Sequence, residues 1–344
     1  MLILFTLSFI TRICRFTAMA FAGNTWWTYL LFSLIASFAL LGNSLVLYVL
    51  ITKKSYLKQP YNIFIFSLAL TDILSGVFLV ISRYLYLPPT PDGEIQREIF
   101  CRTIWNAWTL FTLGYISIYT CTALTFERWL AVTRPQTYRA IKQSQAIKAV
   151  AFVWLWGIII NVTTLFRTKF IPSKQSCSWT ALDVANEVFP WVDFTLQSII
   201  PFVTMVGLYI HILHTMERLP MMSSEQQPIK KVTMVALAAS TTIIIGWIPS
   251  RVSFMLSKYG IVDPNSLLHY CLIMLSLANS CWNPILYGIY SSQFRNEYIK
   301  IYKNVFRLEK PMSSNGAARG AVNRGLASDN SASGNQSTTK STQL

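Results

Sequence analysis

Three residues near the end of a long apolar stretch have side chains that could do chemistry with one another. Glu127, Arg128 and Trp129 come toward the end of a stretch that begins at about Ile99. Arginine keeps its proton and presents a rigid fork of donors, so in an apolar setting Arg128 needs an acceptor, and Glu127 is the nearest. Taken alone, Arg128 could equally be an arginine that reaches back to water at a membrane edge. The rest of the chain has to decide between the two.

Asp72 is a second carboxylate in an apolar setting, because apolar residues flank it on both sides. Burying an ionised carboxylate in a membrane is costly. Asp72 therefore requires a partner, a proton or an ion.

The elements that must position these residues are apolar runs long enough to cross a membrane. Of the 344 residues, 53% are hydrophobic and 12% are charged, whereas soluble domains carry about a quarter charged residues. Seven apolar runs reach roughly 20 residues, the length that a membrane helix needs. The sequence therefore predicts an all-α membrane protein with a bundle of seven transmembrane helices. The predicted spans are Trp26–Ile51, Pro60–Leu87, Ile99–Thr133, Gln145–Phe166, Val188–Met216, Ile229–Ser257 and Asn265–Tyr290.

The positions of the lysines and arginines predict how the chain crosses the membrane. The formal net charge is +15, and lysines and arginines follow the first, third and seventh spans and precede the sixth. By the positive-inside rule the odd-numbered connections lie in the cytosol and the N-terminus lies outside. The connection that holds Arg167, Lys169 and Lys174 fits this rule less well. The basic excess is assigned to topology and to contact with anionic lipid, and not to nucleic acid.

Four parts are expected along the chain. Residues 1–25 form a short extracellular N-terminus, with a cleaved signal peptide as an alternative because Ala18-Met19-Ala20 resembles a cleavage site. Residues 26–291 form the transmembrane domain. Residues 292–310 form a short amphipathic eighth helix on the inner leaflet, since apolar and basic residues alternate there at helical spacing. Residues 311–344 form a disordered cytoplasmic tail rich in Ser, Thr, Asn, Gly and Ala.

Two of the six cysteines lie on the side assigned as outside, where disulfides persist. A bridge between these two, Cys101 and Cys177, would tie the top of the third span to the loop after the fourth. Cys121, Cys271 and Cys281 fall within spans and are expected to be small buried apolar residues.

These residues, in this order and in these spans, resemble the rhodopsin-like (class A) G-protein-coupled receptors. The resemblance covers about Trp26 to Phe306, with Trp129 in place of the usual tyrosine. The residues that carry it are Asn43, Leu68, Ala69, Asp72, Cys101, Cys177, Glu127, Arg128, Trp129, Trp154, Pro201, Tyr209, Trp247, Pro249, Asn283, Pro284 and Tyr287.

The resemblance implies an activation switch. Glu127 would hold Arg128 at rest, and the sixth helix would swing outward on a kink at Pro249. Tyr209 and Tyr287 would then turn inward and stabilise an open state that admits a helix of a heterotrimeric G protein. No acid stands near the cytoplasmic start of the sixth span, so an ionic lock from Arg128 to that helix is not expected and basal activity could be raised. The switch set comprises Glu127, Arg128, Trp129, Tyr209, Trp247, Pro249, Asn283, Pro284 and Tyr287.

The resemblance also implies an ion site. Asp72, Ser117, Asn279 and Asn283 supply oxygens of the kind that sodium prefers, and in the family such an ion stabilises the resting state beneath Trp247. The alternative is a hydrogen-bonded polar cluster without an ion. The sequence indicates no other metal and no cofactor.

Two further charges, Asp193 and Arg251, fall inside spans. Arg251 lies four residues after Trp247, and Gln197 lies four residues after Asp193, so each pair shares one helix face. Asp193 and Arg251 could form a structural salt bridge, or they could bind complementary charges on a ligand such as a peptide terminus or a zwitterion. Other residues that could line this cavity are Arg83, Tyr86, Tyr115, Phe254, His269 and Tyr270, with His269 expected at the rim and not as a metal ligand.

The residue types at the pocket positions restrict the class of ligand. Leu110 occupies the position where aminergic receptors carry an aspartate, so a monoamine is not expected. Short extracellular loops and an aromatic, doubly charged pocket favour a small neuropeptide. A small non-peptide ligand and a constitutively active receptor are the alternatives.

Other partners are expected at the tail. Its serines and threonines could bind arrestin once phosphorylated, and Thr342, Gln343 and Leu344 fit the groove of a PDZ domain. A transporter would show paired half-repeats, and an enzyme would need converging nucleophile and acid–base residues, and neither pattern is seen. The sequence therefore predicts a multi-pass plasma-membrane receptor with no catalytic residues.

Overall fold

Seven long apolar helical segments dominate the computed structural model, which describes residues 26–84, 92–179, 188–218, 227–263 and 266–306. Each segment is long and apolar enough to cross a membrane, which confirms the predicted all-α bundle. In the described residues these spans are Tyr29–Thr52, Pro60–Ser82, Glu94–Thr133, Gln143–Phe166, Pro190–Arg218, Ile229–Ser257 and Leu267–Tyr290.

Three spans are single helices and four are interrupted. The single helices are α2 (Trp26–Thr52), α3 (Pro60–Tyr84) and α11 (Gln227–Lys258), the last with Pro249 in its interior. The third span joins α4 (Glu94–Phe100), a π-helical turn (Cys101–Trp105) and α5 (Trp108–Thr133), and the fourth joins α7 (Gln143–Ile159) and α8 (Val162–Phe166). The fifth joins α9 (Val188–Phe194), a π-helical turn (Thr195–Ile199) and α10 (Ile200–Arg218), and the seventh joins α12 (Leu267–Ala278), a 3₁₀ turn (Asn279–Cys281) and α13 (Trp282–Tyr290).

The connections hold shorter elements. Two strands, β1 (Thr168–Ile171) and β2 (Ser176–Trp179), pair in antiparallel register on either side of a 3₁₀ turn (Pro172–Lys174). This hairpin was not predicted from the sequence, because its strands are only four residues long. The remaining elements are a 3₁₀ turn (Tyr56–Lys58), α6 (Pro135–Arg139) and α14 (Ser292–Val305).

The third span was predicted as one helix from Ile99, and this is wrong in detail. Ala107 adopts a left-handed backbone conformation with φ of 54°, which ends the π-helical turn and starts α5 anew. The structure has a helix, α14, where the eighth helix was predicted, and its role as an amphipathic helix on the inner leaflet stays a prediction. The predicted N-terminal part and tail lie outside the described residues.

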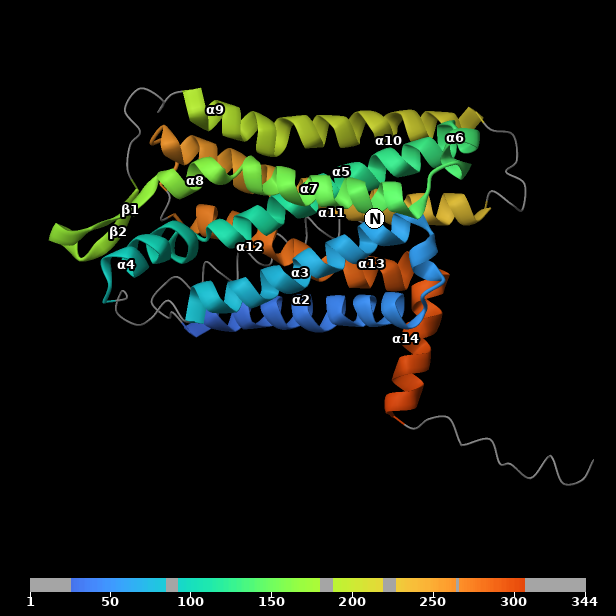
Figure 1. The fold of residues 1–344 in the computed structure, drawn as a ribbon, viewed down its shortest axis with the longest axis horizontal. Helices are drawn as coiled ribbons and strands as arrows, with labels where there is room; N and C mark the ends of the chain where they lie inside the picture. The colour runs from blue at the N-terminus through green and yellow to red at the C-terminus, as the bar shows by residue number, and fades with distance from the viewer. Residues whose placement is uncertain (1–25, 85–91, 180–187, 219–226, 264–265, 307–344) are drawn as a thin grey trace, which may run out of the picture. The chain divides into compact units, whose positions relative to one another are not determined.

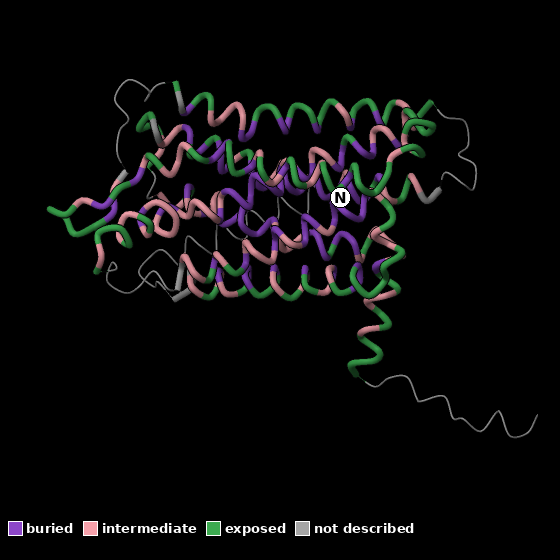
Figure 2. Tube along the Cα trace, viewed as in Figure 1, coloured by how far each residue is buried: buried purple, intermediate pink, exposed green. Residues whose placement is uncertain are grey.

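The helix α5 is central, since it packs against α3, α7, α10 and α11 (Figure 1). Buried residues gather on the faces that the helices turn toward one another, and the outer faces are exposed (Figure 2). The exposed residues of the outer faces include large apolar side chains such as Phe38, Phe152 and Val203. An outward apolar face is what a lipid environment requires.

Polar contacts between helices add specificity to this packing. The Trp154 indole donates to the Ser67 hydroxyl at 2.9 Å, which joins α7 to α3. The Asn161 amide donates to the Thr112 hydroxyl at 2.8 Å, between the fourth and third spans. Hydrogen bonds of this kind stabilise helix pairs where no water competes for the partners.

The predicted disulfide between Cys101 and Cys177 is present, with 5.4 Å between the Cα atoms. It ties the start of the π-helical turn above α5 to β2, and both cysteines are buried against Phe170 of β1. The end of the bundle that carries this disulfide is called the disulfide end below, and the opposite end, near Arg128, is called the Arg128 end.

A glycine makes the closest approach between α7 and α5. A Cβ atom added to Gly157 would lie 2.5 Å from Cγ1 of Ile116, which is fully buried. Gly157→Ala should therefore destabilise the bundle by about 1–3 kcal/mol through overpacking, measured as a lower midpoint of thermal unfolding in nanodiscs. Gly207→Ala is the matched control, because nothing lies within 4 Å of a Cβ at Gly207. Equal midpoints for the two variants would contradict the packing seen between α7 and α5.

Candidate functional site

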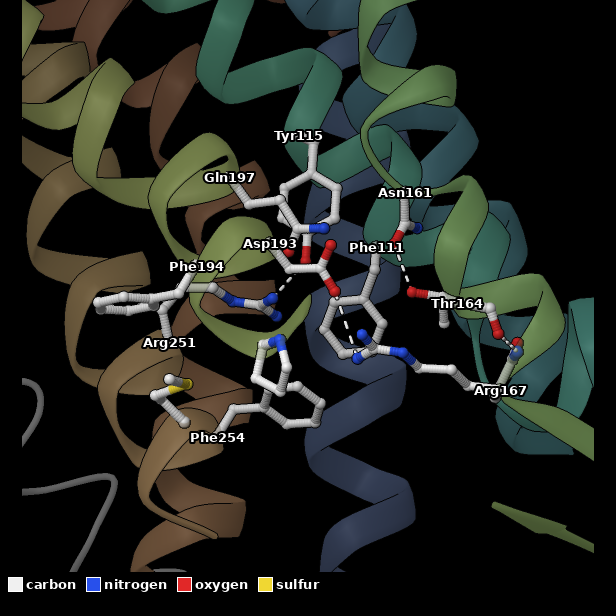
Figure 3. A pocket seen from close by; sticks show the side chains of 13 residues that line it. Phe111, Tyr115, Asn161, Thr164, Arg167, Asp193, Phe194, Gln197, Arg251 and Phe254 are labelled. Atoms are coloured by element: carbon white, nitrogen blue, oxygen red, sulfur yellow. Dashed lines mark hydrogen bonds and ion pairs between the residues drawn. The ribbon is translucent and has the colours of Figure 1, made fainter. Parts of the chain in front are cut away.

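A pocket opens inside the bundle toward the disulfide end, and it is called the charged pocket here. Its volume is about 80 Å³. Aromatic residues form much of its wall, and Arg167, Asp193 and Arg251 are its charged residues (Figure 3). The lining residues are Asn106, Phe111, Tyr115, Asn161, Thr164, Arg167, Pro190, Asp193, Phe194, Gln197, Arg251, Phe254 and Met255.

Arg251 enters this pocket from α11 as a buried cation among aromatic rings. Its guanidinium carbon lies 5.2 Å from the ring centres of Phe111 and Tyr115, and 5.5 Å from those of Trp247 and Phe254. Its Nη1 donates a short hydrogen bond to the Tyr115 hydroxyl, while its buried Nε has no partner among the described residues. Ring faces attract a cation, but they do not accept its directional hydrogen bonds as a carboxylate does.

Asp193 forms its ion pair with Arg167, at 3.3 Å between Nη1 and Oδ2. The Thr163 hydroxyl also donates to this carboxylate, at 3.3 Å. The alternative of a structural salt bridge between Asp193 and Arg251 is therefore wrong, since no ion pair within 4 Å joins the two among the described residues. Arg167 was missed as a site residue. Its position directly after the fourth span, where a basic residue fitted the charge rule poorly, was the available signal.

The other predicted pocket residues divide into two groups. Tyr115, Gln197 and Phe254 line the charged pocket as expected, and the Gln197 amide donates to the Ile160 carbonyl at 3.0 Å. His269 is not at the rim: it is buried and hydrogen-bonded at 2.9 Å to the Ser253 hydroxyl. Leu110 packs in an apolar cluster with Leu79 and Met274. Tyr270 is half-buried and is not among the described lining residues, and the Arg83 side chain and Tyr86 lie outside what the structure describes.

A smaller cavity lies deeper in the bundle, beside Asp72, and is called the Asp72 cavity. Its volume of about 20 Å³ suffices for one water molecule or one small ion, which needs about 10–15 Å³. Asp72, Ser117 and Asn279 line it, and the Asn283 amide donates to the Asp72 carboxylate at 2.8 Å.

The oxygens around this cavity fit a sodium ion. Ser117 Oγ, Asn279 Oδ1 and Asn283 Oδ1 are buried and have no hydrogen-bond partner among the described residues. Buried oxygens without partners are rare in folded proteins. Together with the Asp72 carboxylate they are hard oxygen donors, the type that a small hard cation such as sodium prefers. No group of three or more His, Cys, Asp or Glu side chains that could hold another metal occurs in the described part of the chain.

Trp247 separates the two cavities. It lines the Asp72 cavity, and its ring also contacts the Arg251 guanidinium on the side of the charged pocket. The ring fits only because residue 114 is glycine, since a Cβ on Gly114 would lie 2.2 Å from the indole Cη2. A ligand group that displaces Arg251 would therefore change the contacts of the Trp247 ring.

Near the Arg128 end, the predicted ion pair is present. Arg128 Nε donates to Glu127 Oε2 at 2.5 Å, and Nη2 donates a shorter bond to Oε1. Nη2 also donates to the Tyr138 hydroxyl of α6 at 2.8 Å, and the guanidinium lies 4.9 Å from the ring centre of Tyr61. Partial burial raises the pKa of Tyr138 to about 12, so at neutral pH this hydroxyl is a neutral acceptor. Among the described residues the polar partners of Arg128 thus lie on its own helix and on α6, and none lies on α11.

Tyr138 and Tyr61 were not singled out from the sequence. The spacing of 10 residues between Arg128 and Tyr138 crosses the turn at Pro135, so no helical periodicity links the two.

Three hydroxyl groups join three helices beside Arg128. Thr125 of α5, Tyr209 of α10 and Ser240 of α11 lie 3.2 Å apart in each pairing. Tyr209 is therefore already turned inward, where the resemblance implied that it turns only on activation. Tyr287 is also buried, and its hydroxyl has no partner among the described residues.

The remaining predicted switch residues surround these contacts. The Trp129 indole donates to Nδ1 of His211 on α10 at 2.8 Å. Pro249 lies inside α11, and Pro284 is buried in α13. The structure places these residues on the helices expected for them, and their roles in switching stay predictions.

Comparison with known proteins gives these sites their context. The family model for the 7 transmembrane receptor (rhodopsin family) matches residues 42–287, most of the chain. Galanin receptor 2a of Danio rerio is 25% identical over 292 residues, which are 81% of this chain and 78% of the relative. Galanin receptor type 1 of Mus musculus is 24% identical, covering 83% of this chain and 84% of the relative. Somatostatin receptor type 4 of Rattus norvegicus is 25% identical, covering 79% and 71%.

The family match spans all seven predicted membrane segments, at least in part, and includes Arg128, Asp72 and Trp247. The chain therefore belongs to the rhodopsin family of seven-transmembrane receptors, the class A G-protein-coupled receptors.

Proposed function

We propose that this receptor binds a small extracellular peptide and in response activates a heterotrimeric G protein by outward movement of the sixth span. Two groups of relatives support the ligand class, since they are named as receptors for galanin and for somatostatin, which are neuropeptides. The charged pocket supports it too, because its charged and aromatic side chains suit the terminus or a side chain of a peptide.

The observation that carries the proposal is that one helix serves both sites. The α11 helix supplies Arg251 to the charged pocket and Ser240 to the hydroxyl contacts beside Arg128. These two residues are 11 positions apart, about 16 Å along a helix. A displacement at one end is therefore transmitted to the other by a continuous helix with a proline at Pro249.

The contacts at the Arg128 end support an easily biased equilibrium. Movement of α11 has to break the contacts of Ser240 with Thr125 and Tyr209, but it breaks no polar contact of Arg128 among the described residues. We infer from this that the closed state is only weakly favoured. This supports raised basal activity as part of the proposal.

A second candidate is a small non-peptide ligand. The volume of about 80 Å³ favours it, because a compact molecule would fill the charged pocket without contacts to the loops. The two candidates predict different sizes of agonist.

Sodium is proposed as an allosteric ion in the Asp72 cavity. Asp72, Ser117, Asn279 and Asn283 would hold it, and its charge would stabilise the ionised carboxylate. Without an ion these residues form a polar cluster with several unsatisfied oxygens.

The proposed orientation puts the disulfide end outside the plasma membrane and the Arg128 end in the cytosol. The charge distribution of the connections supports it. Arrestin binding by the phosphorylated tail, PDZ binding by Thr342, Gln343 and Leu344, and lipid contact by α14 are further proposals that rest on the sequence. The tail lies outside the described residues.

The proposed function is tested with pooled short peptides and small metabolites on cells that express the full chain and a promiscuous G-protein reporter. We expect at least one short peptide to activate the reporter, and Arg128→Ala to abolish the response while surface expression and peptide binding persist. Activation by metabolites alone would favour the second candidate. A response that survives Arg128→Ala would contradict the switch.

Weakening the contacts that hold Arg128 should raise basal signalling. We expect Glu127→Gln to raise agonist-independent reporter activity about fivefold or more, the effect of about 1 kcal/mol in a two-state equilibrium. Tyr138→Phe should raise it less, because only one hydrogen bond is lost. Tyr48→Phe on the exposed face of α2 is the control and should have no effect. Unchanged basal activity in Glu127→Gln would show that this ion pair does not restrain the receptor.

Sodium should stabilise the resting receptor through Asp72. In nanodiscs without agonist, the thermal midpoint should be higher in NaCl than in choline chloride of equal ionic strength, because an ion that binds only the folded state stabilises it. Asp72→Asn should remove the difference, and Asp92→Asn, at an exposed carboxylate, should retain it. Equal midpoints in the two salts for the wild-type receptor would favour the polar cluster without an ion.

A further inference from the structure

The charges that line the charged pocket do not balance. Among the described residues that line the pocket, two guanidinium groups, of Arg167 and Arg251, face one carboxylate, of Asp193, which leaves an excess of one positive charge. In Figure 3 both arginines reach into the pocket, with the Asp193 carboxylate drawn between them. The carboxylate makes its ion pair with Arg167, and among the described residues no ion pair within 4 Å includes Arg251.

Arg251 has too few acceptors for a buried guanidinium. Arg251 is only 6% exposed, and its guanidinium offers five N–H donors in a planar fork. The Tyr115 hydroxyl accepts from Nη1, and the buried Nε has no partner in the part of the chain that the structure describes. The four aromatic rings around it attract the charge but provide no acceptor for Nε. A buried charge in this state is costly unless another group completes its hydrogen bonds.

We infer that Arg251 binds a carboxylate of the ligand. A carboxylate accepts two parallel hydrogen bonds from a guanidinium fork, which would use the idle Nε. This deepens the proposed function and rests on it for the place of the ligand. A zwitterion that puts its ammonium on Asp193 is disfavoured, because Arg167 and Thr163 already bind that carboxylate.

The dimensions of the pocket restrict what carries the carboxylate. A volume of about 80 Å³ has room for about five to eight water-sized groups, at about 10–15 Å³ each. Phe111 and Phe254 stand beside Arg251, so the part next to the carboxylate should be apolar. Two sources share this chemistry: the C-terminal carboxylate of an apolar residue, and the side chain of an acidic residue.

The test compares matched acid and amide probes on the full-length receptor in nanodiscs, with affinities taken from ligand-induced thermal stabilisation. The first pair is N-acetyl-leucine and N-acetyl-leucinamide, which stand for a peptide C-terminus. The second pair is the α-amides of N-acetyl-glutamate and N-acetyl-glutamine, which stand for an acidic side chain. We expect the acid of one pair to bind at least about tenfold more tightly than its amide, the effect of one charge-assisted hydrogen bond. The pair that shows the preference identifies the source.

Variants assign the preference to Arg251. Arg251→Gln should reduce the ratio of acid to amide affinity to about one, and Arg251→Lys should retain part of it, because the charge remains without the fork. Asp193→Asn should act in the opposite direction and tighten acid binding, since a nearby negative charge is removed. Arg97→Gln is the control, because Arg97 stacks on Phe170 in the hairpin and does not line the pocket.

Three results would overturn the inference: equal affinities for acid and amide in the wild-type receptor, a preference that survives Arg251→Gln, or no binding of either acid at millimolar concentration. If Arg251→Gln fails to fold, Arg251→Lys decides the matter: a full acid preference in that variant would overturn the inference, because the guanidinium fork is gone. The assay needs no signalling, so an acid preference in a receptor that no peptide activates would support this inference and contradict the proposed function. A peptide agonist that is equally potent without any carboxylate would support the function and overturn the inference.

Discussion

The interior of a membrane bundle holds little water, so the protein itself has to stabilise every charge that is buried there. The arrangement of this receptor depends on the partners that it gives to its buried charges. Arg128 is the most completely bonded, with two hydrogen bonds to Glu127 and one to Tyr138. Asp72 accepts from the Asn283 amide and faces a cavity of ionic size. Arg251 has aromatic rings around it and, among the described residues, one hydroxyl acceptor. The hydrogen bonding of these buried charges therefore becomes less complete from the Arg128 end toward the disulfide end.

This gradient agrees with the way in which the sites are connected. The α5 helix supplies Glu127 and Arg128 near one end, Ser117 in the middle and Tyr115 at the charged pocket, while α11 crosses it with Ser240, Trp247 and Arg251. A rigid pair of helices can couple distant sites only if one of them has two positions of similar energy. Among the described residues, the polar contact of α11 with α5 beside Arg128 is the hydroxyl pair of Thr125 and Ser240 and not a salt bridge, which supports the proposal that α11 moves.

The bundle, the spans and the disulfide could be predicted because they depend on local composition, on hydropathy and on motif residues at fixed places in the helices. The contacts that could not be predicted depend on the reach of side chains between segments. Arg167 reaches Asp193 across 26 residues of sequence, and Tyr138 reaches Arg128 around the turn at Pro135. His269 was expected at the rim because polarity was weighed without its partner, although the Ser253 hydroxyl allows it to be buried.

The unsatisfied polar atoms of the interior are informative for the same reason that they are rare. Among these atoms, which lack partners within the described residues, are Ser117 Oγ, Asn279 Oδ1, Tyr287 Oη and Arg251 Nε. Ser117 and Asn279 line the Asp72 cavity, Arg251 lines the charged pocket, and Tyr287 lies in α13. A protein optimised for one state alone would fill such positions with satisfied or apolar groups. Trp247 stands between the two cavities on a glycine that leaves no space beneath it. A ligand that moves Arg251 would change the surroundings of the Trp247 ring, whose centre lies 5.5 Å from the guanidinium carbon. On this argument the incomplete bonding of the interior supports the proposal that the receptor has a second state.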